Sequence, residues 1–298
     1  MAKPKTAMVL SGGGSLGAVQ VGMLQALSRT NVVVDMVVGA SVGALNGAFF
    51  ADDPTPAGAD RLAEVWRGLR RRDVFPLTLW AGLMALLFGR DHLVEASRLR
   101  TIVRHSLRIN RIEQAQLPLH VVTTDVLSGE AVLLSSGEVE TALLASTAIP
   151  VVFPHVELDG RCLVDGGVSN NTPIASAIAL GAERILVLPT GMSCALREPP
   201  RNMAALALHV MDLQNMRQLE RDVAHYAADA SIVIVPPLCP LVSVFDFSQT
   251  GALIERAATQ TRNWLDAGGL ESSDPLHVPL AHHDQCVTAS HGACHVAA

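Results

Sequence analysis

Short apolar runs alternate with longer segments of helical periodicity along most of the chain. The runs are rich in valine, isoleucine and leucine and are bounded by glycine or polar residues, which is typical of buried strands. They predict strands at 6–10, 33–38, 119–125, 131–134, 161–164, 184–188 and 232–235. Helical spacing predicts a helix to about Arg29 after the first strand, a helix start at Thr172-Pro173, and helices over 42–50, 60–69, 202–228 and 250–265.

This alternation predicts an α/β fold with a mainly parallel central sheet covered by helices. The chain shows no internal repeat, so we expect a single domain over residues 6–266. The pattern ends at Gly268-Gly269, and residues 267–298 are expected to form a polar, disordered tail.

The composition excludes several classes of protein. Hydrophobic residues make up 49% of the 298 residues and charged residues 17%, which excludes disorder for most of the chain. The net charge of -6 argues against a nucleic-acid partner, because such proteins present a basic surface. No apolar run reaches the roughly 18 residues of a membrane-spanning helix, and the N-terminus has no signal-peptide pattern. The five cysteines are scattered, so we expect a reduced, cytoplasmic protein that can associate peripherally with a membrane.

The sharpest local motif is Gly39-Ala40-Ser41-Val42-Gly43, which lies between an apolar strand and a helical run. Glycines two residues before and after a serine permit a strained turn that presents the hydroxyl above the sheet. The first amides of the following helix then favour negative charge beside that hydroxyl. The motif therefore indicates a nucleophilic serine. The alternative is an ordinary turn of small residues that packs a helix against a strand.

A glycine-rich loop, Gly12-Gly13-Gly14-Ser15-Leu16-Gly17, follows the first predicted strand and precedes a helix, where free backbone amides can bind an anion. In one interpretation the loop is a dinucleotide fingerprint, and Asp35 is the carboxylate that binds the ribose. In the other, the amides of Gly13 and Gly14 form an oxyanion hole. We favour the second, because Asp35 leads directly into the serine motif rather than into the helix and third strand of a dinucleotide-binding unit.

A nucleophilic serine needs a base. His209 and His225 lie within a predicted amphipathic helix rather than in a strand-end loop, where a catalytic side chain is expected. Asp165 ends a predicted strand, and Gly166-Gly167 after it lets the backbone approach the serine closely. A carboxylate can act as a general base when burial raises its proton affinity. Asp165 is therefore the preferred partner, although an isolated Asp-Gly is also common in turns.

Taken in order, these three motifs resemble those of the patatin-like phospholipase family. Two further segments are similar to it, Ala145-Ser146-Thr147-Ala148-Ile149-Pro150 with Phe153-Pro154 and Val122 to Glu130, so the resemblance spans about residues 6–265. It implies a three-layer α/β/α fold and a Ser-Asp dyad that hydrolyses lipid acyl esters through an acyl-enzyme, without a metal or cofactor. It makes Ser41 the nucleophile, Asp165 the proton acceptor, and Gly13 and Gly14 oxyanion donors, in motifs that also contain Gly12, Gly17, Gly39, Gly43, Gly166 and Gly167.

Leu16 departs from the resemblance, because many members of that family carry arginine at this position. The departure implies that backbone amides alone stabilise the anion, and it weakens the expectation of a charged phospholipid substrate. A non-catalytic lipid- or acyl-binding module with the same fold is the alternative function. A covalent fluorophosphonate probe distinguishes the two, since only an activated serine reacts.

Residues 74–88 form an apolar segment that is too short to span a bilayer. We expect a lid or an interfacial anchor, with Arg70-Arg71-Arg72 beside it for anionic headgroups, because Pro76 and Gly82 would interrupt a regular core helix. A buried helix is the alternative. In the tail, a zinc site is the alternative to disorder, but the spacing of cysteine and histidine fits no standard zinc site, so we favour a disordered tail. The residues concerned are Cys286, His291, Cys294 and His295.

Overall fold

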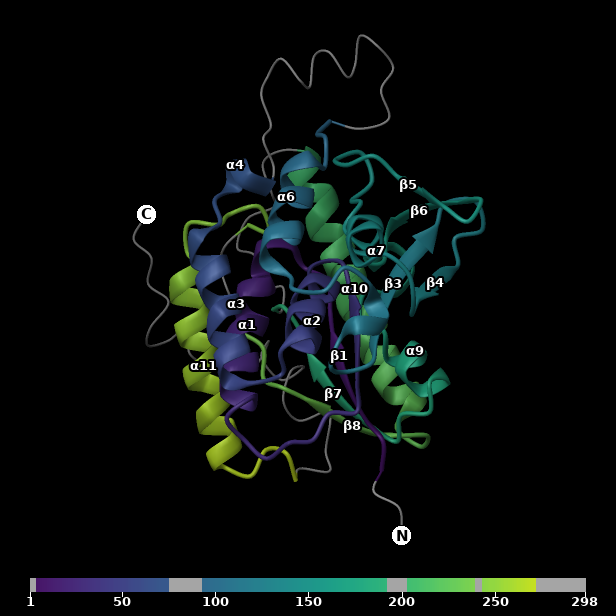
Figure 1. The fold of residues 1–298 in the computed structure, drawn as a ribbon. Helices are drawn as coiled ribbons and strands as arrows, with labels where there is room; N and C mark the ends of the chain where they lie inside the picture. The colour runs from purple at the N-terminus through teal and green to yellow at the C-terminus, as the bar shows by residue number, and fades with distance from the viewer. Residues whose placement is uncertain (1–3, 75–92, 192–202, 239–242, 272–298) are drawn as a thin grey trace.

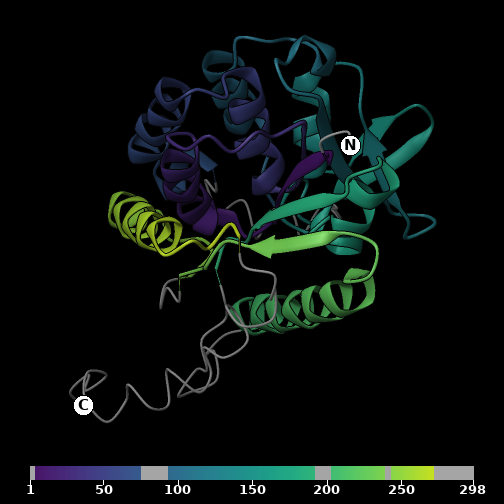
Figure 2. The ribbon, with the colours of Figure 1, turned by 90° about the horizontal axis from the view of Figure 1, so that it is seen from below.

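The computed structural model describes residues 4–74, 93–191, 203–238 and 243–271. An eight-stranded sheet lies between two layers of helices, as the two views in Figures 1 and 2 show. Hydrogen-bonded neighbours follow the path β5-β6-β3-β2-β1-β7-β8, and β4 also pairs with β3. The strands are β1 (Thr6–Leu10), β2 (Met36–Ala40), β3 (Leu119–Asp125), β4 (Ala131–Leu134), β5 (Val156–Leu158), β6 (Arg161–Asp165), β7 (Arg184–Leu188) and β8 (Ser231–Ile234).

Helices cover both faces of the sheet. The larger layer holds α1 (Gly17–Leu27), α2 (Val42–Asp52), α3 (Pro56–Gly68), α4 (Arg71–Val74), α6 (Ser97–Ser106), α7 (Val139–Ser146) and α11 (Thr250–Asp266). The opposite layer holds α9 (Ile174–Ala179) and α10 (Met203–Tyr226). Three short helices connect these elements: η1 (Gly14–Leu16), η2 (Ile112–Gln114) and α8 (Gly167–Asn170). No helix of the described residues is long and apolar enough to cross a membrane.

Burial on both faces explains the continuous apolar runs of the central strands. In β1, Met8 and Leu10 belong to the core under the larger helical layer, whereas Ala7 and Val9 belong to the core under α9 and α10. Successive side chains of a strand point to opposite faces, so a strand covered on both faces has no polar alternation. The three-layer α/β/α fold with its parallel centre is therefore confirmed. β4 and β6 run antiparallel to β3, and β5 pairs antiparallel with β6, so the sheet is mixed.

The pairing of β3 brings two strand ends together. β2 pairs with residues 119–122 in parallel, and β6 pairs with 123–125 in the antiparallel direction, whereas β4 pairs with 121–124. The register of β4 overlaps both of the others, and a strand has only two edges. It follows that β2 and β6 share one edge of β3 and that their carboxyl ends meet head to head beside Val122 and Thr123.

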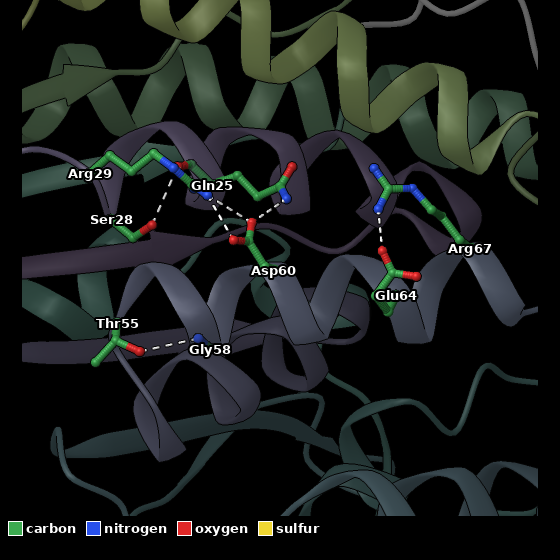
Figure 3. A network of polar contacts seen from close by, with 8 residues as sticks. All are labelled: Gln25, Ser28, Arg29, Thr55, Gly58, Asp60, Glu64 and Arg67. Carbon is green, nitrogen blue, oxygen red and sulfur yellow. Dashed lines mark hydrogen bonds and ion pairs between the residues drawn. The ribbon is translucent and has the colours of Figure 1, made fainter.

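Helix α3 is fixed to α1 by a polar cluster that Figure 3 shows. The Asp60 carboxylate accepts hydrogen bonds from Gln25 on α1 (2.7 Å) and from Arg29 just after α1 (2.9 and 2.7 Å). The Thr55 hydroxyl caps the helix by accepting from the Gly58 amide at 3.1 Å. Opposite charge lowers the pKa of Asp60, with the Arg29 hydrogen bond as the main cause. The contact holds α3 in place, and α3 forms one wall of the cavity described below.

Several predicted elements need correction. The second strand was expected at 33–38 but begins at Met36, because Val33 is half exposed and Ala7 pairs with Met36. The pattern missed β5, α6 and α7. Helix α9 begins at Ile174, one residue after Pro173. Residues 75–88 of the predicted lid and the tail from 272 onward lie outside the described residues.

Candidate active site

The head-to-head meeting of β2 and β6 places Ser41 next to Asp165. Ser41 directly follows β2, and Asp165 is the last residue of β6. The Ser41 Oγ donates a hydrogen bond of 2.6 Å to Asp165 Oδ2. Both side chains are buried, with residue exposures of 7% and 6%. The two predicted residues, which are 124 positions apart in the chain, therefore form a direct pair.

Ser41 has a strained backbone, as expected of a nucleophile turn. Its φ of 53° and ψ of -127° are rare for a residue with a side chain. The turn is possible only because its flanks are glycine: a Cβ on Gly39 would lie 2.5 Å from the Gly43 carbonyl oxygen, and one on Gly43 would lie 2.3 Å from that of Leu10. Helix α2 begins at Val42, so the positive end of its dipole lies beside the Ser41 hydroxyl.

The surroundings of Asp165 suit a proton acceptor. Burial raises its pKa to about 6, and hydrogen bonds from the Ser41 hydroxyl and the Gly167 amide reduce the shift. The Gly167 amide donates to Oδ1 at 2.7 Å and so leaves Oδ2 to Ser41. A carboxylate with a pKa near 6 is ionised at neutral pH and is a much stronger base than an exposed aspartate.

The glycine-rich loop lies beside this pair, because β1 and β2 are parallel neighbours whose carboxyl ends share one edge of the sheet. Gly13 and Gly14 have φ values of +157° and +58°. Their amides donate to no acceptor among the described residues. Both glycines line the same cavity as Ser41 and Asp165. Free amides in the same cavity as a reactive hydroxyl are the donors that an oxyanion requires.

Two residues that the motifs did not identify hold this loop. The Gly12 amide donates to the Asn171 carbonyl at 3.0 Å, and the Thr190 hydroxyl donates to the Gly12 carbonyl at 2.8 Å. Asn171 follows α8, and Thr190 lies just beyond β7. Nothing in the local sequence pattern distinguishes Asn171 or Thr190. A role in holding the loop could have been suggested only by their positions just after a helix and a strand that end near it.

Two cavities meet at Ser41. One, of about 70 Å³, is almost entirely apolar and lies among α2, α3 and α6. It is lined in part by Leu45, Phe49, Trp66, Ile102, Val103 and Phe247. The other, of about 100 Å³, is more polar and contains both members of the pair. Its walls include Gly13, Gly14, Asp165, Asn171, Asp212 and Asn215. Ser41 therefore has an apolar space on one side and hydrogen-bonding groups on the other.

Three other residues considered in the sequence lie elsewhere. Leu16 is buried in the larger core and lines neither cavity. His209 and His225 are on α10 and also line neither; the ring of His225 packs edge-on against Tyr226. The two histidines are thus not part of the Ser41 site.

Asp35 does not support the dinucleotide interpretation. Its carboxylate accepts a hydrogen bond of 2.7 Å from the Thr6 amide, and its own amide donates to the Thr6 carbonyl at 2.8 Å. Thr6 begins β1, whereas the glycine-rich loop follows the other end of that strand. The length of β1 therefore separates Asp35 from the loop amides.

One group of metal-ligand side chains occurs among the described residues: His155, Glu157 and Cys162, whose ligand atoms lie within 4.8 Å of one another. They lie on the β5–β6 hairpin, and none of them lines a cavity that contains Ser41. His155 and Glu157 are exposed, and such groups are common without an ion. The prediction that the reaction needs no metal or cofactor stays a prediction. The cysteines and histidines of the tail lie outside the described residues.

Solved structures with a similar fold include human GIVD cytosolic phospholipase A2. The superposition has a TM-score of 0.51 at 12% sequence identity and covers 91% of this chain and 62% of that one. A second structure of that protein, in complex with a fluorophosphonate inhibitor and terbium chloride, gives 0.52 at 13% identity, with 91% and 59% covered. At such low identity the likeness concerns the fold alone.

Sequence relatives include an uncharacterized NTE family protein of Mycobacterium bovis, 32% identical over 182 residues, which are 60% of this chain and 47% of that protein. Mouse patatin-like phospholipase domain-containing protein 7 is 28% identical over 188 residues, 62% of this chain and 13% of that protein. The chain thus spans less than half the length of these relatives. The sequence model of the patatin-like phospholipase family matches residues 8–178, more than half of the chain, and the chain therefore belongs to that family.

Proposed function

We propose that this protein is a serine lipid acyl hydrolase. The observation that carries the proposal is the hydrogen bond of 2.6 Å between the Ser41 hydroxyl and the buried Asp165 carboxylate, at the junction of an apolar cavity and a more polar one. A buried hydroxyl that donates to a carboxylate of raised pKa is the arrangement of an activated nucleophile. Family membership supports lipid hydrolysis as the reaction class.

The reaction proceeds through an acyl-enzyme. Ser41 Oγ bonds to the ester carbonyl carbon while Asp165 Oδ2 takes the hydroxyl proton. The amides of Gly13 and Gly14 stabilise the negative carbonyl oxygen. The carbon–oxygen bond to the alcohol then breaks, and the alcohol leaves with the proton from Asp165. Water repeats the sequence: Asp165 takes its proton, the hydroxyl oxygen bonds to the acyl carbon, and Ser41 recovers the proton as the fatty acid departs.

The two cavities divide the substrate between them. Burial of a hydrocarbon chain in the apolar cavity gains about 0.8 kcal/mol per methylene group. The leaving alcohol then lies in the polar cavity, where the side chains of Asn171, Asp212 and Asn215 line the wall. This division supports an ester of a fatty acid with a polar alcohol as the substrate class.

The test uses Ser41→Ala and Asp165→Asn, with Ser28→Ala as the control. Ser28 is a serine at the end of α1, and its hydroxyl donates only to the Gln25 carbonyl. Hydrolysis of p-nitrophenyl esters and of phosphatidylcholine vesicles should fall at least about a thousandfold in the first two variants. Labelling by a fluorophosphonate should disappear in Ser41→Ala. Unchanged hydrolysis in Ser41→Ala would refute the proposal, whereas binding of lipid without labelling of the wild type would support a non-catalytic module.

A further inference from the structure

Ser146, the last residue of α7, lies at the junction where β2 and β6 meet. Its residue exposure is 0%, and it lines neither cavity at Ser41. A substrate held in those cavities therefore does not touch it. Any effect of Ser146 on the reaction has to pass through its neighbours.

The Ser146 hydroxyl makes two hydrogen bonds across the junction. It accepts from the Ser41 amide at 2.9 Å and donates to the Val122 carbonyl on β3 at 2.6 Å. The hydroxyl therefore joins the residue that follows β2 to β3, the strand with which both β2 and β6 pair. Among side chains of this size, only a hydroxyl can accept and donate strongly at the same atom.

The backbone after the same residue holds the other strand end. The Ser146 carbonyl accepts from the Gly166 amide at 3.2 Å, and the Ala148 carbonyl accepts from the Asp165 amide at 3.0 Å. The end of α7 thus contacts both Ser41 and the segment of Asp165. It lies at the point on β3 where pairing with β2 ends and pairing with β6 begins.

The Ser41 turn needs such support. A residue with a side chain in the backbone conformation of Ser41 is strained, and it keeps that conformation only when its surroundings hold it. Without the Ser146 hydroxyl, the buried Ser41 amide and Val122 carbonyl lose this hydrogen-bond partner. Relaxation of the turn would then relieve both the backbone strain at Ser41 and the unpaired polar groups.

We propose that Ser146 is a positioning residue that sets the distance and angle between Ser41 and Asp165. This proposal rests on the proposed function of that pair. The residue acts through the Ser41 amide and the Val122 carbonyl, so its loss misplaces the nucleophile and leaves substrate binding intact.

The test compares Ser146→Ala, Ser146→Cys and Ser146→Thr with Thr123→Val as the matched control. The Thr123 hydroxyl is also fully buried on β3, but it donates to Val132 of β4, at the opposite edge. We expect kcat on p-nitrophenyl esters to fall about 10- to 100-fold in the alanine and cysteine variants, because small misplacement of reacting groups is costly. KM should change less than about threefold. Ser146→Thr, which keeps the hydroxyl, should recover most of the loss.

The pH profile separates positioning from a general loss of stability. The hydrogen bond from Ser41 lowers the pKa of Asp165, so a displaced Ser41 lets that pKa rise. The acidic limb of kcat/KM should therefore move to higher pH in Ser146→Ala and stay in place in Thr123→Val. Ser146→Cys keeps nearly the size of serine, so it tests the same point if the alanine variant folds poorly.

Two results would overturn the inference. One is a kcat within about threefold of wild type in both the alanine and the cysteine variants. The other is an equal loss of kcat in these variants and in Thr123→Val, with the acidic limb of kcat/KM unchanged in all of them. Amide hydrogen exchange gives a readout that does not depend on activity, because the Ser41 amide should lose protection only when position 146 lacks the hydroxyl. Loss of that protection, with Ser41→Ala still active, would sink the proposed function but leave the structural contact standing.

Discussion

Replacement of Asp165 by asparagine should stabilise the folded protein at neutral pH while it removes activity. Burial raises the pKa of this carboxyl from an ordinary value of 3.8 to about 6. The folded state therefore keeps the proton up to about pH 6, whereas the unfolded state loses it near pH 3.8. Between these values the folded state binds more protons, so the free energy of unfolding decreases as the pH rises. Asparagine cannot ionise, and the variant has no such loss.

The size of the effect follows from the shift of about two pH units. At about 1.4 kcal/mol per unit, the ionised carboxyl costs the folded state about 3 kcal/mol once the pH exceeds 6. The protonated carboxyl stabilises the folded state fully below pH 3.8, and this stabilisation is fully lost above about pH 6. A cost of this size is a large part of the stability of a typical domain. The buried Asp165 carboxylate therefore lowers the stability of the folded protein at neutral pH.

Urea unfolding, followed by circular dichroism between pH 4 and 7.5, measures the effect. The difference in unfolding free energy between Asp165→Asn and wild type should grow by about 2–3 kcal/mol over this range. Asp229→Asn, a change of an exposed aspartate in the turn before β8, should follow the wild type at every pH. A difference that stays constant within about 0.5 kcal/mol would refute the argument, because it would mean that the folded and unfolded states bind the same number of protons at position 165.

Two further predictions concern the reaction. Asp165 must be ionised to accept the Ser41 proton, so kcat/KM for a neutral ester should decrease as the pH is lowered through about 6. A decrease that begins only near pH 4 would show that the carboxyl is not desolvated in the active enzyme. Ile102→Trp should fill part of the apolar cavity and lower kcat/KM for 16-carbon acyl esters about tenfold or more relative to 4-carbon esters, because lost methylene contacts weaken binding. Thr101→Trp, on the exposed side of the same helix, is its control, and an equal ratio in both variants would place the acyl chain elsewhere.

The sequence by itself determined the elements whose cause is local. The apolar run at 6–10 predicts a buried strand by its residue types and its length, and it forms β1. Gly39 and Gly43 reveal the serine turn because close backbone approach excludes any Cβ there. Local glycine motifs also predicted Ser41 and Asp165, each by itself. Helices α6 and α7 were missed because their local patterns are ambiguous: α7 reads as a short apolar run, and only two of the ten residues of α6 are buried hydrophobics.

Only the tertiary structure decided that these two residues lie together. Ser41 and Asp165 meet because β2 and β6 share one edge of β3, and that register depends on long-range pairing that no short window of sequence contains. For the same reason the motifs gave no role to Ser146, whose hydroxyl partners are 105 and 24 residues away in the chain. The raised pKa of Asp165 also belongs to the fold, since it arises mainly from burial. Burial depends on the layers that pack around a side chain. It is not set by the type of that side chain or by its neighbours in the sequence.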